Sequence, residues 1–271
     1  MIDLIAIDMD GTLLNAAHEI SLRVRNAIAA AHAKGVRIVL ATGRPYSGAQ
    51  RYLQELGITG DDDYCICFNG SVLQSVGTGA CIAEFPLGFD DFLYCEQLAR
   101  QLGVHFQALD GSGILTTNAD ISAYTVHDAH LSNAPLRYRA VAEMDKTLRF
   151  QKLMMVDAPE LLDKAIARLP DALRQRYGVS KSAPFFLEIF DRRAGKGTML
   201  QLLAERLGIP PARVMAIGDQ ENDLSMLAYA QTSVAMGNAI PAVKAVARYE
   251  TATHNEDGVA QAIERFVLSP P

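Results

Sequence analysis

The chain has 271 residues, of which 49% are hydrophobic and 21% are charged, and its net charge is -6. This length suggests about two domains with a sizeable core. The acidic balance and the lack of a basic patch interleaved with aromatic residues argue against a nucleic-acid partner. No apolar run approaches the roughly 18 residues of a membrane span, and no basic secretory leader is visible. We therefore expect a cytoplasmic protein with no membrane partner.

The first dozen residues form the stretch around which the fold is expected to be organised. Residues 4–7 are apolar and rich in branched side chains, which predicts a strand buried on both faces. Asp8 and Asp10 follow, and Gly11 allows a turn. Residues i and i+2 of an extended chain point to one side, so both carboxylates are expected at the carboxyl end of the strand. Such a pair favours a hard divalent cation, most naturally Mg²⁺, although a plain Asp-Gly turn is the alternative.

The following segments alternate between helices and strands. Ser21 is expected to cap a helix with apolar residues at helical spacing, at Leu22, Val24, Ala27, Ile28 and Ala31. The next expected elements are a strand over 36–41, a helix over 46–56 and a strand over 64–68. This order predicts a parallel, doubly wound sheet. The four cysteines lack zinc spacing and are expected to be reduced thiols, with Cys65 and Cys67 on one face of a strand.

The regular alternation stops between residues 84 and 190 and resumes afterwards. Helices are expected over 91–102, after Asn118 and after Pro159, and strands near 105–107, 114–117, 149–156 and 185–189. This less regular order predicts an inserted α+β domain. The later elements are expected as a helix over 198–207, a strand over 214–217, a helix over 223–230, a strand over 232–235 and a helix from about 257. The sequence thus predicts one α/β core, residues 1–83 and 191–271, split by a second domain over 84–190.

Two further stretches open predicted helices and could bind an anion. Thr42-Gly43-Arg44 follows a strand, and its hydroxyl and backbone N–H groups would form an anion site, although an ordinary helix cap is at least as common. Lys196 also stands at a helix start. A lone lysine is usually a surface charge, but beside carboxylates it could bind a phosphoryl oxygen and keep a nucleophile ionised.

The last of these stretches, Gly218 to Asp223, again follows a predicted strand. Asp219 could complete an oxygen-rich Mg²⁺ site with Asp8, and Asp223 could support that site from behind. Each stretch alone is modest support for a site. Their joint occurrence at the carboxyl ends of strands is specific.

Together these stretches resemble the four motifs of the haloacid dehalogenase-like phosphatase superfamily. The matching segments are Asp8-Met9-Asp10-Gly11-Thr12, Thr42-Gly43-Arg44, Lys196 and Gly218-Asp219-x-x-Asn222-Asp223. The insertion, with Thr42-Gly43-Arg44-Pro45 and Asn69-Gly70, resembles the Cof-type branch with a large C2 cap. Over essentially the whole chain the sequence is most similar to the bacterial YidA-type sugar phosphatases. The resemblance implies a Rossmann-like catalytic core and a cap that sets substrate specificity.

The resemblance also implies a role for each motif residue. Asp8 would be the nucleophile and Asp10 the general acid and base. Mg²⁺ would be held by the carboxylates of Asp8 and Asp219 and the backbone carbonyl of Asp10, with Asp223 behind them. The expected phosphate-binding residues are Met9, Thr42, Gly43, Arg44, Lys196 and Asn222.

The expected activity is Mg²⁺-dependent hydrolysis of a small phosphorylated metabolite, most naturally a sugar phosphate, by a monomer or homodimer. A phosphomutase that needs a bisphosphate activator remains an alternative, and so does a regulatory binding protein without turnover. The lack of membrane spans excludes a transport ATPase with the same chemistry. Tyr124, His127 and Glu188 could read sugar hydroxyls from the cap, although such residues more often have packing or hinge roles.

Overall fold

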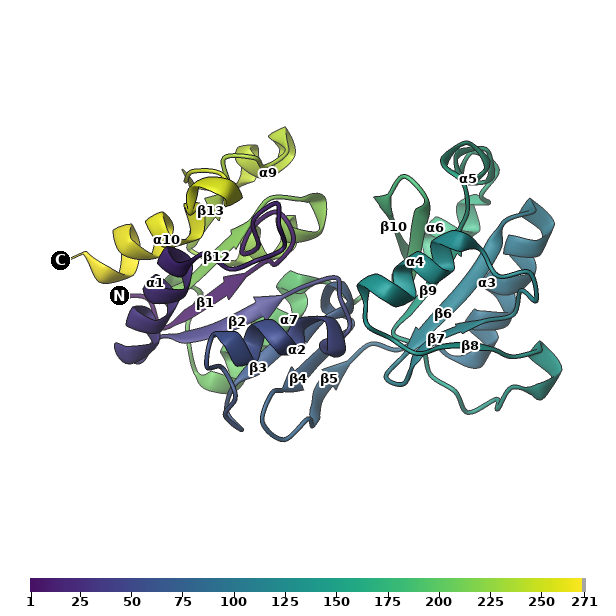
Figure 1. Cartoon of the computed structure of the whole chain (residues 1–271), viewed down its shortest axis with the longest axis horizontal. Helices are drawn as coiled ribbons and strands as arrows, with labels where there is room; N and C mark the ends of the chain where they lie inside the picture. The colour runs from purple at the N-terminus through teal and green to yellow at the C-terminus, as the bar shows by residue number, and fades with distance from the viewer. Residues whose placement is uncertain (270–271) are drawn as a thin grey trace. The chain divides into compact units, whose positions relative to one another are not determined.

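The computed structural model describes residues 1–269 and separates into two compact units. The first unit contains residues 1–83 and the chain from 195 onward, and the second contains residues 84–194. In the first unit, the purple N-terminal strands and the green to yellow C-terminal strands lie in one sheet (Figure 1). Among residues 1–269, no helix combines the length and apolar character needed to cross a membrane.

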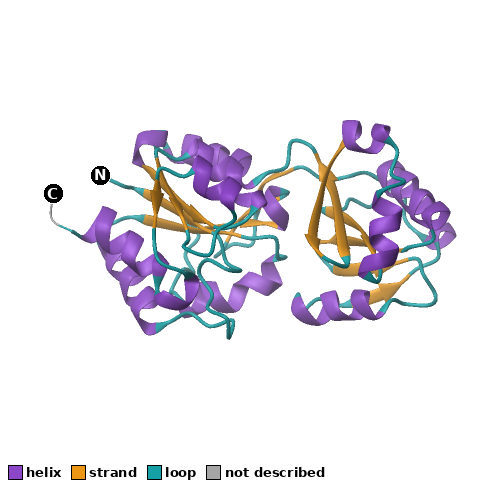
Figure 2. Cartoon of the chain, turned by 90° about the horizontal axis from the view of Figure 1, so that it is seen from above, coloured by secondary structure: helices purple, strands orange, loops and turns teal. Residues whose placement is uncertain are grey.

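The first unit is built on a sheet of eight strands in the order β14-β13-β12-β1-β2-β3-β4-β5. Its strands are β1 (Leu4–Ile7), β2 (Arg37–Ala41), β3 (Tyr64–Cys67), β4 (Val72–Ser75), β5 (Cys81–Glu84), β12 (Val214–Gly218), β13 (Thr232–Ala235) and β14 (Tyr249–Glu250). The pairs from β14 to β3 are parallel, and β1 lies between β2 and β12. Helices cover both faces of this sheet (Figure 2). The expected parallel, doubly wound α/β core is therefore confirmed.

The α-helices described in the first unit are α1 (Leu22–Ala33), α2 (Tyr46–Glu55), α7 (Lys196–Leu207), α8 (Leu224–Tyr229), α9 (Pro241–Val246) and α10 (Gly258–Ile263). Helix α1 packs on α10, and α7 packs on α8. Ser21 caps α1 as expected, because its side chain accepts the N–H of Val24 at 3.2 Å. Val24, Ala27, Ile28 and Ala31 form the buried face of α1, whereas Leu22 is exposed because it lies about 200° around the helix from Val24.

Beyond β3 the core departs from the predicted pattern. The chain turns sharply through η1 (Phe68–Gly70), where Asn69 has a φ of 56°, and β4 returns antiparallel to β3. Gly70 has a φ of +88°, and a Cβ there would lie 2.2 Å from the backbone of Gly195. Only glycine allows both this conformation and this approach. The turn consequently lies directly against the start of α7.

The second unit contains a sheet of six strands in the order β10-β11-β9-β6-β7-β8. Its strands are β6 (His105–Asp110), β7 (Gly113–Thr116), β8 (Leu136–Tyr138), β9 (Lys152–Val156), β10 (Tyr177–Ala183) and β11 (Phe186–Asp191). Its helices are α3 (Phe89–Leu102), α4 (Ala123–Leu131), α5 (Pro159–Ile166) and α6 (Asp171–Arg176). All neighbouring strands are antiparallel except β7 and β8. The expected mixture of strands and helices is present, and β8, β10 and α6 are additions to it.

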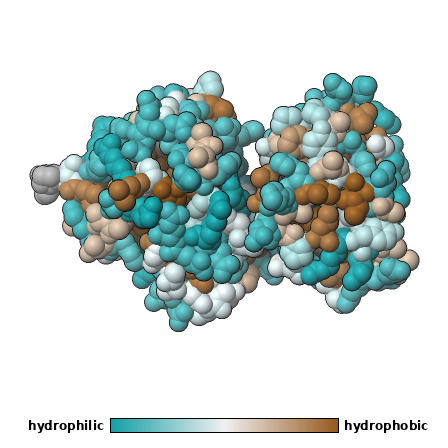
Figure 3. Space-filling model, viewed as in Figure 1, coloured by the Kyte–Doolittle hydropathy of each residue, from teal (hydrophilic) through white to brown (hydrophobic). Residues whose placement is uncertain are grey.

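The two faces of this second sheet differ in chemistry. One face carries an apolar core in which the ring of Phe92 lies 5.0 Å from that of Phe150 and 5.4 Å from that of Phe106. Gln107 and Lys152 alternate with core residues along β6 and β9, so they belong to the opposite face. The visible surface of both units is mostly hydrophilic, with small apolar areas, as expected where apolar side chains fill the interior (Figure 3).

Candidate active site

Three carboxylates meet at the carboxyl end of the parallel core strands. Asp8 follows β1, Asp219 follows β12, and Asp223 ends the short helix η4 (Glu221–Asp223) before α8. The strands β1 and β12 are paired with Ile7 beside Ile217, so the residues that follow them emerge together. One oxygen from each carboxylate lies within 4.8 Å of the others, and all three residues are buried. This is the edge at which open α/β sheets bind ligands.

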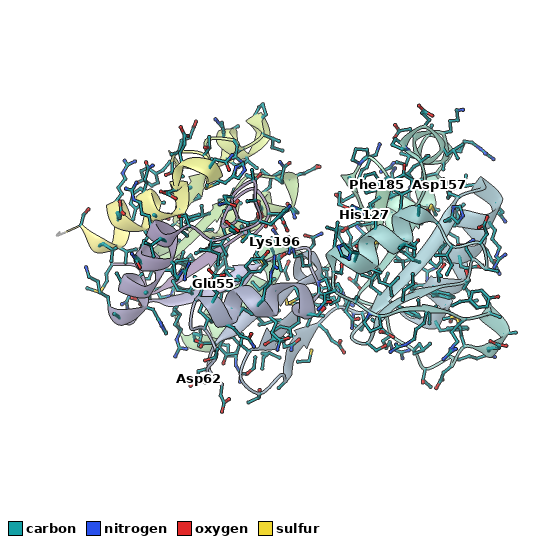
Figure 4. The ribbon with its side chains drawn as sticks, viewed as in Figure 1. Glu55, Asp62, His127, Asp157, Phe185 and Lys196 are labelled. Carbon is teal, nitrogen blue, oxygen red and sulfur yellow. The ribbon has the colours of Figure 1, made fainter. Side chains whose placement is uncertain are left out.

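Lys196 holds this cluster together from the first residue of α7. Its Nζ donates to Asp8 Oδ1 and to Asp223 Oδ1, both at 2.6 Å, and the residue is fully buried. Figure 4 shows Lys196 inside the first unit. Burial alone would lower the pKa of Lys196, but the charges of Asp223 and Asp8 outweigh it and raise that pKa. The lysine is therefore an ammonium cation, and it is not the surface charge that the plainer interpretation assumed.

The cluster carries more negative than positive charge. Burial and the charge of Asp223 raise the pKa of Asp8 well above its usual range, although Lys196 opposes this rise. Burial also raises the pKa of Asp219. Three carboxylates around one ammonium group offer hard oxygen ligands and an unbalanced charge, and this donor set suits Mg²⁺. The residues present therefore fit the metal that the family resemblance implies.

Asp10 does not join this buried group. Strand β1 ends at Ile7, and the chain then turns so that Leu13 N–H donates to the carbonyl of Asp8. The Asp10 carboxylate forms a bidentate pair with Arg44, at 2.9 Å from Nε and 2.5 Å from Nη2. The structure thus places the Asp10 carboxylate against Arg44 and outside the buried group that contains Asp8.

The expected phosphate-binding residues come from several segments: Thr42, Gly43 and Arg44 follow β2, Met9 follows β1, Asn222 lies in η4 and Lys196 starts α7. Thr42 is fully buried after β2, and its hydroxyl accepts the N–H of Arg44 at 3.1 Å. A Cβ on Gly43 would lie 2.9 Å from the amide oxygen of Asn69. That same oxygen accepts a hydrogen bond from Asn222 at 2.8 Å, which joins the fourth motif to the turn after β3. Met9 is buried, and its carbonyl accepts N–H groups of the turn that follows.

Two residues of the site were missed by sequence reasoning. Thr12 donates its hydroxyl hydrogen to Asp219 Oδ1 at 2.9 Å. Asn238, after β13, donates to the carbonyl of Gly11 at 2.9 Å and lies 3.4 Å from Asp219 Oδ2. Thr12 belongs to the first motif and could have been found there. For Asn238, the one feature of the sequence that could have indicated a site residue is its position after a predicted parallel strand.

The three residues proposed from the second domain lie in two different surroundings. Glu188 is buried and accepts a hydrogen bond from Lys152 at 2.8 Å. The ring of Tyr124 stacks on Phe185 at 4.7 Å, and His127 meets the edge of that ring at 5.8 Å. Figure 4 shows His127 and Phe185 in the second unit. Tyr124 and His127 therefore share one aromatic cluster, whereas Glu188 is part of an ion pair inside the unit.

Comparisons with known proteins agree with this geometry. Residues 5–263 match the family model of the haloacid dehalogenase-like hydrolases. A Bacillus subtilis protein named "Putative phosphatase YxeH" is 45% identical over 99% of this chain and 100% of its own. The 5-amino-6-(5-phospho-D-ribitylamino)uracil phosphatase YitU of the same organism is 30% identical, with 97% of each chain covered. A haloacid dehalogenase-like hydrolase from Bacteroides thetaiotaomicron superposes with a TM-score of 0.88 at 33% identity, covering 98% of this chain and 99% of its own. The chain belongs to the haloacid dehalogenase-like hydrolase family.

Proposed function

We propose that this protein is a Mg²⁺-dependent phosphatase that hydrolyses small phosphorylated metabolites through an aspartyl-phosphate on Asp8. The observation that carries the proposal is the buried cluster at the end of β1, where Lys196 binds one oxygen of Asp8 and two more carboxylates lie beside it. A buried carboxylate with one oxygen bound by a lysine ammonium group and the other left to attack is suited to act as a nucleophile. The relatives named as phosphatases support the same class of reaction.

The first half of the reaction transfers the phosphoryl group to the enzyme. Lys196 fixes Oδ1 of Asp8, so we assign the attack on phosphorus to Oδ2. As the new P–O bond forms, the ester P–O bond breaks and its electron pair goes to the leaving oxygen. Asp10 donates a proton to that oxygen. Bound Mg²⁺ would supply positive charge to the phosphoryl oxygens and the carboxylates, held by Asp8, Asp219 and the Asp10 carbonyl with Asp223 behind.

The second half returns the enzyme to its starting state. Asp10, now a carboxylate, takes a proton from water, the water oxygen bonds to phosphorus, and the acyl-phosphate bond breaks to free Asp8. Phosphoryl transfer mainly requires positioning and positive charge around the three equatorial oxygens. We assign this task to Lys196, Thr42, Asn222, Arg44 and the amides of Met9 and Gly43. Arg44 already binds Asp10, which places its charge beside the acid that serves the leaving group.

Sugar phosphates are our first candidate substrates, because the sequence motifs resemble those of the YidA-type sugar phosphatases. The second unit is assigned to substrate specificity on the same ground. The named substrate of YitU also carries a phosphorylated sugar-alcohol chain, which supports a small phosphorylated metabolite.

The decisive experiment measures phosphate release from a panel of sugar phosphates, with Mg²⁺ and with EDTA, for the wild type and Asp8→Asn. We expect Mg²⁺-dependent release that the substitution abolishes, and a phosphorylated Asp8 in rapidly quenched wild-type samples analysed by mass spectrometry. Release that Asp8→Asn leaves intact would overturn the mechanism. If no ester is hydrolysed, the assay is repeated with a bisphosphate activator: sugar-phosphate isomerisation would then identify a mutase, and no reaction would indicate a binding protein.

A further inference from the structure

Asn238 links three segments that meet beside the carboxylate cluster. Its Nδ2 donates to the carbonyl oxygen of Gly11 at 2.9 Å and lies 3.4 Å from Asp219 Oδ2. Its Oδ1 accepts the backbone N–H of His254 at 3.0 Å. One side chain therefore contacts the turn after Asp10, the carboxylate after β12 and the loop that precedes α10.

The orientation of this amide is determined by its partners. The His254 N–H can only donate, so it requires the amide oxygen, and the Gly11 carbonyl can only accept, so it requires the amide nitrogen. The backbone on both sides of Asn238 is also fixed. Gly237 N–H donates to Ala252 at 3.0 Å, and Ile240 N–H donates to the carbonyl of Asp219 at 3.0 Å. Asn238 is thus held in place before any ligand binds.

Gly11 packs directly against the side chain of Asp219. Gly11 has a φ of +81°, and a Cβ there would lie 2.5 Å from Asp219 Oδ2. Thr12 binds the other oxygen of Asp219, at 2.9 Å. Each oxygen of this carboxylate therefore has neutral donors: Thr12 on Oδ1, and on Oδ2 both Gln220 at 3.2 Å and Asn238 at 3.4 Å. Of the donors on Oδ2, Asn238 is the one that also binds the Gly11 turn. A neutral donor can orient a carboxylate without cancelling the negative charge that a divalent cation requires.

We propose that Asn238 is a positioning residue that presets Asp219 and the Gly11 turn for a divalent cation. This inference rests on the proposed Mg²⁺-dependent function and adds to it a residue outside the four motifs. Asn238 acts through Asp219 and Gly11, and it is not assigned a contact with the substrate. Partners that orient metal ligands in this way typically contribute 10-fold to 100-fold to metal affinity or activity.

The test compares Asn238→Ala with Asn255→Ala. Asn255 is an exposed amide in the same loop as His254, and its oxygen accepts the N–H of Ala16 at 2.9 Å. It therefore tethers the loop without a contact to Asp219 or Gly11 in this structure. Mg²⁺ binding is read from the rise in melting temperature during a Mg²⁺ titration, and Mn²⁺ binding from the electron paramagnetic resonance signal of the free ion. Phosphate release is followed against Mg²⁺ concentration in parallel.

For Asn238→Ala we expect the half-saturating Mg²⁺ and Mn²⁺ concentrations to rise by about 10-fold to 100-fold. The KM for the phosphate ester should stay near the wild-type value at saturating Mg²⁺. Asn255→Ala should titrate like the wild type. If Asn238→Ala does not fold, Asn238→Ser replaces it, because a serine hydroxyl is too short to reach both Gly11 and Asp219.

An unchanged metal titration in a folded Asn238 variant overturns the inference. An equal shift of the half-saturating metal concentration in Asn255→Ala overturns it too, because tethering of the loop would then explain the shift. These outcomes leave the proposed function intact, because the wild type still binds Mg²⁺ and releases phosphate. A wild type that shows neither property would contradict both.

Discussion

Each of the two units buries a lysine side chain against carboxylates. The two clusters differ in how many carboxylates share the ammonium group. In the first unit, Lys196 binds Asp8 and Asp223. An oxygen of Asp219 lies within 4.8 Å of an oxygen of each of these two carboxylates. These residues come from segments far apart in the sequence, and they meet where parallel strands end. Three carboxylates thus surround one ammonium group, a donor set that suits a divalent cation.

In the second unit, the charge of the corresponding lysine is matched by that of one carboxylate. Lys152 of β9 donates to Glu188 of β11 at 2.8 Å, and Ser182 donates to the same oxygen. The nearby Asp128 of α4 accepts hydrogen bonds from Gln107 at 2.6 Å and from Ser132 at 3.2 Å. Neutral donors thus satisfy the second carboxylate. A buried charge is therefore a poor sign of a catalytic site by itself, and an unbalanced group at the carboxyl edge of a sheet is a better one.

The largest effect is expected from Lys196→Met, which would break the first cluster. Without the ammonium group, three buried carboxylates would lack their shared partner. We expect phosphate release to fall by about 10³-fold or more. We also expect the free energy of unfolding in EDTA to fall by about 3–5 kcal/mol, as for other buried pairs that lose one member. Activity assays and urea unfolding measure the two effects.

The matched control is Lys244→Met, since Lys244 is partly exposed in the same unit and pairs with Glu250 at 3.3 Å. Its removal should cost about 0–1 kcal/mol and leave phosphate release unchanged. If Lys196→Met behaves like this control, Lys196 does not organise the cluster.

Asp10→Asn tests acid and base catalysis without removing a residue of the buried carboxylate cluster. Asp10 is half exposed and lies outside the cluster, so the substitution should leave stability near the wild-type value. The loss of acid and base catalysis should lower kcat by about 10²–10⁴-fold. Asp62→Asn, in an exposed loop, should change neither quantity. A kcat for Asp10→Asn equal to that of Asp62→Asn would remove Asp10 from the mechanism.

Lys152→Met tests the balanced cluster of the second unit. It would leave Glu188 buried without its ammonium partner, so we expect a loss of about 3–5 kcal/mol in urea unfolding. The double variant Lys152→Met/Glu188→Leu should recover most of that loss, because neither charge remains to be compensated. Lys181→Met removes a more exposed lysine that pairs with Asp163 in the same unit, and it should cost about 0–1 kcal/mol. A double variant no more stable than Lys152→Met would contradict a balanced pair.

The parts of the fold that the sequence predicted are those determined by local patterns. Strand β1 is a short apolar run, and α1 follows from the Ser21 cap and the spacing from Val24 to Ala31. In contrast, β10 lies at the edge of its sheet and reads Tyr-Gly-Val-Ser-Lys-Ser-Ala, with little apolar alternation. An edge strand with a half-exposed surface does not need that alternation, so no periodic signal existed to detect.

In the site, too, local sequence patterns predict some residues, and contacts between distant segments determine the others. Asp8, Lys196 and Asp219 stand at strand ends or helix starts, and the topology alone brings such positions together. The side chain of Asp10 depends on how the turn after Ile7 closes and on its pairing with Arg44, which no local pattern specifies. Asn238 is identified only by its distances to Gly11 and Asp219, two residues more than 200 and about 20 positions away in the chain.

The smallest effect is expected from Asp128→Asn, which tests whether this second carboxylate of the balanced cluster is needed as a charge. Burial raises the pKa of Asp128, although Lys152 and the hydrogen bond from Gln107 oppose the rise. The unfolded chain releases this proton at about pH 4, while the folded chain keeps it to higher pH. Asp128 therefore lowers stability progressively as the pH rises from about 4 through its raised pKa, and the loss is complete above it.

Asparagine can still accept the hydrogen bond from Gln107, and it does not titrate. We therefore expect Asp128→Asn to be at least as stable as the wild type at pH 7 and to lose less stability between pH 4 and 7. The change in the free energy of unfolding should be smaller than the loss of about 3–5 kcal/mol expected for Lys152→Met. Urea unfolding at several pH values measures it, with the exposed Asp163→Asn as control. An Asp128→Asn variant less stable than the wild type at pH 7 would contradict this expectation. It would mean that the second unit, like the first, requires the negative charge of a second buried carboxylate.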